Sequence, residues 1–251
     1  MATEMLRLAA VGDIHCTKTS SGTLQPLFAQ MAAGADALVL CGDLTDYGLP
    51  EEAKILAAEL AAARVPIIAV LGNHDFESGQ QDEVKRILCD TGVTILDGDA
   101  TEIDGVGFAG VKGFGGGFGQ RALEPWGEPT IKRFVQEALD EALKLESGLA
   151  RLRTERRVVV LHYSPIQATV EGEPTEIFPF VGSSRLEDPL THFPVTLVLH
   201  GHAHHGSPEG RTRNGTPVYN VSLPLLRQLF PDRPFRILEV PVRPAEPSLT
   251  A

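Results

Sequence analysis

The sequence predicts an α/β protein, a class in which buried strands alternate with helices along the chain. Three apolar runs near the start, over residues 6–11, 37–41 and 66–71, are separated by segments with helical spacing. The runs are continuously apolar and do not alternate with polar residues, which is typical of strands covered on both faces. With 251 residues, 43% of them hydrophobic, the chain can bury one substantial core.

The first third of the chain is expected to form three strand–helix units. In order, the predicted elements are Leu6–Val11, Leu24–Ala33, Ala37–Cys41, Pro50–Ala63, Pro66–Leu71 and Gln81–Asp90. The helix at 50–63 begins with proline and has acidic residues in its first turn, as helix N-termini commonly do. Asp13, Asp43 and Asn73 therefore fall just after successive strands.

The middle of the chain is expected to hold short strands, a loop and a long helix. Strands are predicted at Val93–Leu96, Thr101–Asp104 and Val106–Val111. Gly113–Gln120 is too rich in glycine for regular structure, so we expect a mobile loop or lid. Thr130–Glu146 carries apolar residues at helical spacing, which predicts an amphipathic helix.

The last third is expected to complete the sheet structure. Further strands are predicted at Arg157–Leu161, Val195–Leu199, Gly210–Arg213, Pro217–Val221 and Phe235–Val240. Asn214-Gly215 is a hairpin signal between the third and fourth of these. Because no internal repeat or linker divides the chain, we expect a single domain over residues 1–242. The remainder, 243–251, is rich in Pro, Glu and Ser and is expected to be a disordered tail.

Charge and composition exclude several classes of partner. The net charge of −11 argues against long nucleic acid and anionic membrane surfaces, which need clustered lysine and arginine. No run of about 18 apolar residues exists, and the first strand begins too early for a signal peptide to precede it. The three cysteines, Cys16, Cys41 and Cys89, have no paired spacing, which fits a reducing compartment. We therefore expect a soluble cytoplasmic protein, and the sequence leaves its oligomeric state open.

Five short polar motifs follow the predicted strands in a fixed order. They are Asp13-x-His15, Gly42-Asp43, Gly72-Asn73-His74-Asp75, a lone His162 and Gly201-His202-x-His204. Loops that leave one edge of a sheet are where α/β proteins build their active sites. Two side chains in an x-separated pair lie on one face of an extended segment, so they can chelate one ion or straddle two. Imidazole and carboxylate donors without thiolate suit Mn²⁺, Fe or Zn²⁺ better than Ca²⁺ or Mg²⁺ alone.

With these motifs the chain resembles the calcineurin-like metallophosphoesterases, over the range from Asp13 to His204. The resemblance implies two β-sheets packed as a sandwich flanked by helices, with two divalent metal ions at the strand ends. The metal ligands would be Asp13, His15 and His204 at one ion and Asn73, His162 and His202 at the other, with Asp43 bridging both. A metal-bound hydroxide would attack the phosphorus, while His74 protonates the leaving oxygen as general acid and Asp75 orients the His74 imidazole.

The motifs also favour some branches of that family over others. Purple acid phosphatases have a metal-binding tyrosine three residues after the bridging aspartate, where this chain has Asp46. Protein Ser/Thr phosphatases carry an arginine signature that the stretch Gly42–Gly48 lacks. His162-Tyr-Ser-Pro165 and Pro217–Val221 are most similar to bacterial phosphodiesterase-like members. We therefore expect a small phosphodiester substrate, with a cyclic nucleotide as one candidate.

Other interpretations stay open at this stage. The alternatives are a small-molecule phosphomonoesterase, a non-catalytic metal-binding scaffold on the same fold, and a nuclease that would need a basic groove. Asp46 is expected to bond to a ligand histidine, and His200 to be buried without binding metal. The segment Ser164–Ser184 is either an apolar wall for the substrate or a loop that covers the core. Candidate phosphate contacts are Lys18, Lys112 and Arg185.

Overall fold

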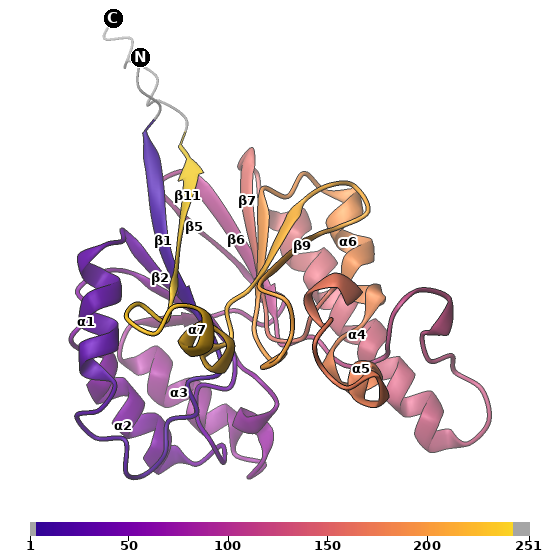
Figure 1. Ribbon diagram of the computed structural model, residues 1–251, viewed down its shortest axis with the longest axis horizontal. Coiled ribbons are helices and arrows are strands. Elements are labelled where there is room, and N and C mark those ends of the chain that lie inside the picture. Colours follow the sequence, from indigo (N-terminus) through magenta and orange to yellow (C-terminus); the bar gives the residue numbers. More distant parts are fainter. Residues whose placement is uncertain (1–3, 243–251) are drawn as a thin grey trace, which may run out of the picture.

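Two β-sheets packed face to face form the centre of the computed structural model, which describes residues 4–242 (Figure 1). The five-stranded sheet has the order β11-β1-β2-β3-β4. Its strands are β1 (Met5–Val11), β2 (Ala37–Cys41), β3 (Ile67–Val70), β4 (Val93–Ile95) and β11 (Arg236–Pro241). The six-stranded sheet has the order β5-β6-β7-β8-β10-β9. Its strands are β5 (Ala100–Ile103), β6 (Val106–Val111), β7 (Arg156–Leu161), β8 (Leu197–His200), β9 (Glu209–Arg211) and β10 (Pro217–Asn220).

Helices cover the outer face of each sheet, which completes the four-layer sandwich that the resemblance implied. Those packed on the five-stranded sheet are α1 (Gln25–Ala33), α2 (Pro50–Leu60) and α3 (Gln81–Asp90). On the side of the six-stranded sheet lie α4 (Pro129–Arg151), α5 (Phe178–Val181) and α6 (Glu187–His192) (Figure 1). A short helix, α7 (Leu223–Leu229), follows β10 directly.

The alternation of side chains along each strand explains why the central strands are apolar throughout. In β1, Leu8 and Ala10 belong to the core between the two sheets, whereas Ala9 and Val11 pack under the helices. Phe108 lies in the same inter-sheet core, from the opposite sheet. Both faces of the central strands are therefore removed from water, as the continuous apolar runs predicted.

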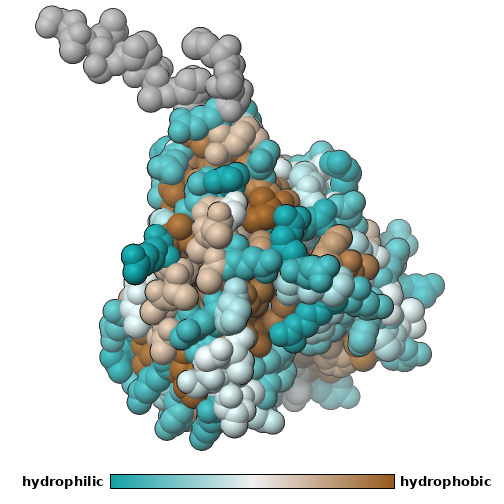
Figure 2. Space-filling model, turned by 60° about the vertical axis from the view of Figure 1, so that its left-hand side comes forward, coloured by the Kyte–Doolittle hydropathy of each residue, from teal (hydrophilic) through white to brown (hydrophobic). Residues whose placement is uncertain are grey.

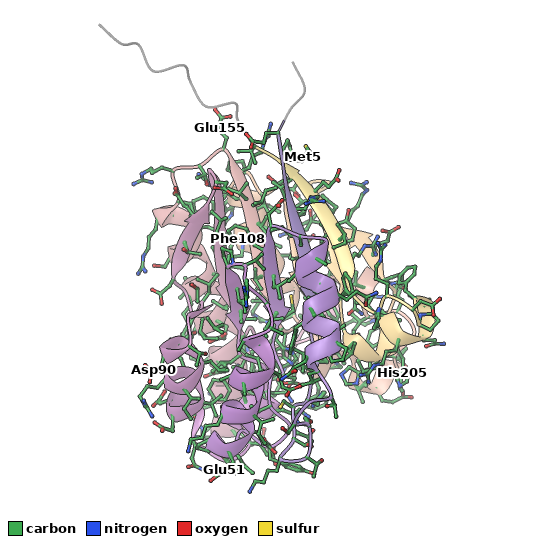
Figure 3. All side chains as sticks on the ribbon, turned by 90° about the vertical axis from the view of Figure 1, so that its left-hand side faces the viewer. Met5, Glu51, Asp90, Phe108, Glu155 and His205 are labelled. Atoms are coloured by element: carbon green, nitrogen blue, oxygen red, sulfur yellow. The ribbon has the colours of Figure 1, made fainter. Side chains whose placement is uncertain are left out.

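The strand directions bring the ends of several strands to one edge of the sandwich. Strands β1 to β4 run parallel to one another, as do β6, β7, β8 and β10. In Figure 3, Met5 and Glu155 lie at one end of the molecule and His205 lies towards the other. Since β1 begins at Met5 and β7 just after Glu155, the carboxyl ends of both sheets meet at the far edge.

The differences from the predicted elements are confined to short or terminal segments. Helix α4 continues to Arg151, five residues beyond the predicted end, and the short helices α5, α6 and α7 were not anticipated. All three contain a proline near their start and are too short to show a periodic pattern. The final strand, β11, pairs antiparallel with β1 at the edge of the sheet. The expected tail, 243–251, lies outside the described residues.

The molecular surface is mostly polar, which fits the many charged residues of the sequence. Polar residues cover most of the face in Figure 2, and apolar residues form only a broken strip down its middle. Within residues 4–242, no helix has the length and apolar character that crossing a membrane would require.

Candidate metal centre

The backbone at the strand ends adopts conformations that side chains rarely tolerate. Asp13, His15, Asp43 and His202 have φ angles of 56°, 48°, 46° and 67°. Left-handed φ values at residues other than glycine are uncommon, and they cluster at functional sites where the surrounding structure enforces them. All four residues are among the predicted metal ligands, so the strain coincides with the predicted site.

Glycines beside these residues let the backbone pack directly against the ligands. A Cβ atom on Gly72 would lie 2.1 Å from Asp43 Oδ1, and one on Gly201 would lie 2.4 Å from Asp13 Oδ2. Both distances are far below any real Cβ contact. The glycines of the motifs are therefore required by close packing against the carboxylates, as well as by the chain turns.

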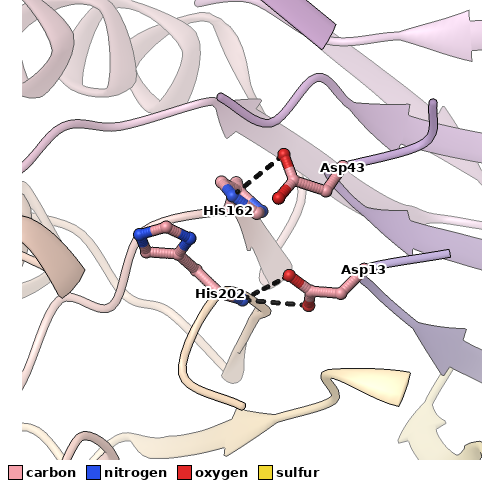
Figure 4. Close-up of side chains that lie close together, drawn as sticks. All are labelled: Asp13, Asp43, His162 and His202. Carbon is pink, nitrogen blue, oxygen red and sulfur yellow. Dashed lines mark hydrogen bonds and ion pairs between the residues drawn. The ribbon is translucent and has the colours of Figure 1, made fainter. Parts of the chain in front are cut away.

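Asp13 anchors one side of the site. Its two carboxylate oxygens accept hydrogen bonds from the backbone N–H of His202 at 3.0 and 2.9 Å (Figure 4). Its Oδ1 also lies 3.1 Å from His204 Nε2. Burial alone would raise the pKa of Asp13, but the bond with His204 and the nearby imidazoles lower it to about 2. Asp13 is therefore a buried carboxylate held in its charged form.

Three acceptor atoms converge at His162. The Nδ1 atom donates to the Cys41 carbonyl at 2.9 Å, so the neutral ring presents Nε2 as an acceptor. That Nε2 lies 2.9 Å from Asn73 Oδ1 and 3.4 Å from Asp43 Oδ1. Burial and the charge of Asp13 raise the pKa of Asp43 to about 7. Three acceptors facing one another repel unless a cation or a proton lies between them, and a metal ion in that place would meet all three.

His15 completes a second group of donors on the other side of Asp43. Its Nδ1 lies 3.1 Å from Asp46 Oδ1, which fixes the ring as predicted for a ligand histidine held by a carboxylate. Its Nε2 is buried and has no hydrogen-bond partner among the described residues. That atom lies 3.8 Å from Asp43 Oδ2. Asp43 therefore directs one oxygen toward His15 and the other toward His162.

His74 stands beside these groups and is more exposed. Its backbone N–H donates to Asp43 Oδ1 at 2.8 Å, and its Nδ1 donates to the Asp46 carbonyl at 2.7 Å. Burial would lower the pKa of His74, but the bond to Asp46 and the charges of Asp43 and Asp46 raise it. With Nδ1 committed to a carbonyl, the second proton of the charged ring sits on Nε2.

Asp75 does not orient the His74 ring, which corrects the role that we expected for it. Its carboxylate is fully buried and accepts hydrogen bonds from the backbone N–H groups of Gly72, Leu44 and Thr45. It also accepts one from Thr45 Oγ1 at 2.6 Å. Asp75 therefore ties the loop after β3 to the loop after β2, and the Asp46 carbonyl orients the imidazole of His74.

His202 closes the site from the six-stranded sheet. Its Nε2 lies 3.1 Å from the Phe180 carbonyl, and its ring is 4.7 Å from that of His162 and 4.5 Å from that of Tyr163. Burial lowers the pKa of His202 to about 3, so the ring is neutral at physiological pH. A neutral imidazole is the form that binds a metal ion.

Among the described residues, His15, Asp46 and His74 form one group of possible metal donors, and the predicted ligands form two further, adjacent groups. One comprises Asp13, His15 and His204, and the other Asp13, Asp43, His162 and His202, with the donor atoms of each group within 4.8 Å of one another. Asp13 belongs to both groups, while Asp43 lies between His15 and His162 through its two oxygens. The orphaned His15 Nε2 and the converging acceptors at His162 show that the residues present fit two divalent cations.

Several supporting residues escaped the sequence reasoning. Asn220 Nδ2 and Ser222 Oγ, at the end of β10, donate to the Ala203 carbonyl at 2.7 and 3.3 Å and so hold the loop between His202 and His204. The one feature of the sequence that could have pointed to Asn220 and Ser222 is the change from apolar to polar residues at the end of this strand. By contrast, His200 is buried as expected and bonds to Gly201 and Thr169.

The two long loops meet beside the site. Gly113 and Gly115–Phe118 of the glycine-rich loop are buried, and Gly116 N–H donates to the Pro179 carbonyl at 2.6 Å. Arg185 donates a hydrogen bond at 2.8 Å to the carbonyl of Leu123, which follows the glycine-rich loop in the sequence. Of the cations predicted to contact phosphate, Lys112 is half-buried and Lys18 is exposed.

Comparison with known proteins identifies the family. A sequence model described as calcineurin-like phosphoesterase matches residues 6–206. The chain belongs to the calcineurin-like phosphoesterase family. The match spans every motif from Asp13 to His204, and it confirms the resemblance seen in the sequence. Members typically bind two divalent metal ions, so this protein is a metallophosphoesterase, a hydrolase of phosphoric esters.

Solved structures confirm the fold. Phosphopantetheinyl hydrolase (PptH) from Mycobacterium tuberculosis has a TM-score of 0.67 and 17% identity, covering 94% of this chain and 97% of its own. The protein TT1561 of Thermus thermophilus has a TM-score of 0.54 and 17% identity, covering 96% and 100%. Purple acid phosphatase PPD1 from yellow lupin has a TM-score of 0.55 and 14% identity, covering 89% and 44%. A search of curated proteins gave no match.

Proposed function

We propose that this phosphoesterase cleaves a small phosphodiester with two divalent cations held by the motif residues. One cation would be bound by Asp13, His15 and His204, the other by Asn73, His162 and His202, with Asp43 between them. The observation that carries this assignment is the convergence of Asp43, Asn73 and His162 acceptors described above. Mn²⁺, Fe and Zn²⁺ all suit this mixture of imidazole and oxygen donors.

The residues of this chain divide the chemistry between them. When bound, two cations would activate a water and neutralise the phosphoryl oxygens. His74 supplies the proton to the leaving oxygen from Nε2, because its Nδ1 is fixed by the Asp46 carbonyl. The raised pKa of His74 keeps that proton available near neutral pH. Asp75 holds the backbone that places His74, through its bonds to Gly72 and Thr45.

A diester is favoured over other substrates for two reasons. The phosphatase signatures are missing after Asp43, and the charge of −11 argues against long nucleic acid. A small cyclic nucleotide is one candidate. Because a protein of the same fold is named a phosphopantetheinyl hydrolase, a phosphopantetheinyl ester belongs in the same substrate panel.

The initial rate of the Mn²⁺-loaded protein on bis-p-nitrophenyl phosphate tests this proposal, with p-nitrophenyl phosphate as the monoester comparison. A higher kcat/KM on the diester supports the phosphodiesterase assignment. A higher value on the monoester makes the protein a small-molecule phosphomonoesterase. If neither is hydrolysed while two metal ions are bound per chain, the catalytic proposal is refuted and a metal-binding scaffold takes its place. The Asp43→Asn variant measures the background rate.

A further inference from the structure

Lys112 places a positive charge among aromatic rings at the end of β6. Its Nζ lies 5.0 Å from the ring centre of Phe114, 5.4 Å from that of Phe76 and 5.5 Å from that of Tyr163. Distances below about 6 Å are typical of cation–π contacts. Among the described residues, its one hydrogen-bond acceptor is the Gly113 carbonyl, at 2.8 Å. An ammonium has three N–H donors, so two remain for another partner.

The charge of Lys112 has no carboxylate partner in the described part of the chain. The nearby acid Glu141 is buried and already engaged, since it accepts from Gly113 N–H at 2.7 Å and pairs with Lys144 at 2.7 Å. Removing a cation from water without an opposite charge is unfavourable, and rings alone compensate only in part. Glu141, Glu137 and Asp97 act on the half-buried ammonium only from beyond ion-pair distance, so a bound anion would give it its first direct charge partner.

The backbone fixes Lys112 against the metal centre. Its carbonyl accepts the N–H groups of both His162 and Tyr163, at 3.1 and 3.0 Å. Tyr163 in turn lies against the His202 ring, so one side chain separates the ammonium from the metal-ligating imidazoles. Phe76, whose ring also lies within cation–π distance of the ammonium, ends the 3₁₀ turn that begins at His74. The charge thus lies beside the turn that carries His74, the proposed general acid.

We propose that Lys112 binds a second phosphate carried by the leaving group, so that the substrate is a diphosphate ester. This inference rests on the proposed function, because it assumes that His74 marks the leaving side. The aromatic rings around Lys112 extend through Phe114 and Phe134, whose centres are 4.8 Å apart, to the exposed Phe180. They provide an apolar surface for the organic part beyond the second phosphate.

Two esters that differ by one phosphate test the proposal: symmetrical diphenyl diphosphate and diphenyl phosphate, both read by release of phenyl phosphate. Lys112→Met keeps the aliphatic stem and removes the charge. It should lower kcat/KM on the diphosphate about ten- to 100-fold more than on diphenyl phosphate, as expected for loss of a charge-assisted hydrogen bond. Lys112→Arg should restore most of the preference. Lys132→Met, an exposed lysine of α4, is the matched control and should leave both rates within about twofold.

Equal losses on both esters, or no loss on either, would overturn the proposal and leave Lys112 as a cap of the Gly113 carbonyl. Calorimetry on the Mn²⁺-loaded protein gives a readout that needs no turnover. Imidodiphosphate should bind more weakly to Lys112→Met than to the parent protein by about tenfold, while orthophosphate binding changes much less. Unchanged imidodiphosphate affinity refutes the second-phosphate site. Absence of turnover on every ester, with this difference in affinity retained, refutes the catalytic proposal instead.

Discussion

Replacing Gly72 by alanine should disable the metal centre by sterics alone. The added Cβ would lie 2.1 Å from both the backbone nitrogen and Oδ1 of Asp43. Contacts below 3.0 Å essentially never occur, so Asp43 or the strand end must move by about 1 Å. Gly72 does not have a left-handed φ, so alanine brings no conformational penalty that would confuse the result.

The expected magnitude follows from the size of that shift. Metal ligands must be placed to within about 0.2 Å, and a misplacement of about 1 Å in an active site costs about 100-fold in activity. Overpacking should also lower the free energy of unfolding by about 1–3 kcal/mol. We therefore expect Gly72→Ala to fold and to lose at least about 100-fold in affinity for one Mn²⁺ ion, measured by calorimetric titration beside thermal unfolding of the metal-free protein.

Gly34→Ala is the matched control, because its Cβ would meet nothing closer than Ile237 Cδ1 at 3.7 Å. That variant should bind metal like the parent. If Gly72→Ala also binds two Mn²⁺ ions with parental affinity, the close packing of Gly72 on Asp43 does not set the geometry of the site.

Three further changes separate the roles of individual residues. Asp43→Asn removes the central anion and should abolish binding of the second metal ion together with activity, measured by metal analysis and initial rates. His74→Ala should keep both metal ions and lower kcat about 100- to 10,000-fold on a substrate with a poor leaving group. Glu59→Gln should destabilise the protein at pH 7 by about 1–3 kcal/mol, since the Glu59 carboxylate accepts three backbone N–H bonds at the start of α1.

The last of these predictions has a definite pH dependence. Burial would raise the pKa of Glu59, but its backbone hydrogen bonds outweigh that effect and lower it below 4.5. Because the folded pKa lies below the unfolded one, the stabilisation is present above about pH 4.5 and is lost as the pH falls through the folded value. Chemical unfolding of both proteins from pH 7 to pH 3 should show their difference shrinking. A difference in unfolding free energy that stays constant with pH would contradict the stabilising role of the Glu59 carboxylate. Retained turnover in His74→Ala would contradict the role of His74 as general acid.

The sequence predicted the buried strands better than it predicted the short helices and the pairing of distant strands. Strands β1, β2 and β3 were predicted to within two residues, because continuous apolar runs mark strands covered on both faces. The pairing of β11 with β1 could not be read, since it joins segments about 230 residues apart and nothing local records the partner. Helices α6 and α7 are too short for a period to show.

The candidate site, too, was predicted from the sequence only in part. The motifs predicted that Asp43 and His162 lie close together, and in the structure Asp43 Oδ1 is 3.4 Å from His162 Nε2. The direction of a side chain within a motif was harder to predict. Asp75 follows His74 directly, but the 3₁₀ turn there points its carboxylate to the buried N–H groups of Leu44 and Thr45. Adjacency in sequence thus gave the wrong hydrogen-bond partner, because local turn geometry decides which way each side chain faces.

The two sheets contribute different halves of the proposed metal centre, so metal ions bound there would link one sheet to the other. Asp13, Asp43 and Asn73 come from the five-stranded sheet, whereas His162 and His202 come from the six-stranded one. A single cut in the exposed stretch 124–128 would place these halves on separate fragments. Neither fragment would carry a complete donor set, so tight metal binding would return only when the fragments reassociate. The affinity of the reassembled protein for the metal ion would then measure how well the two layers fit together.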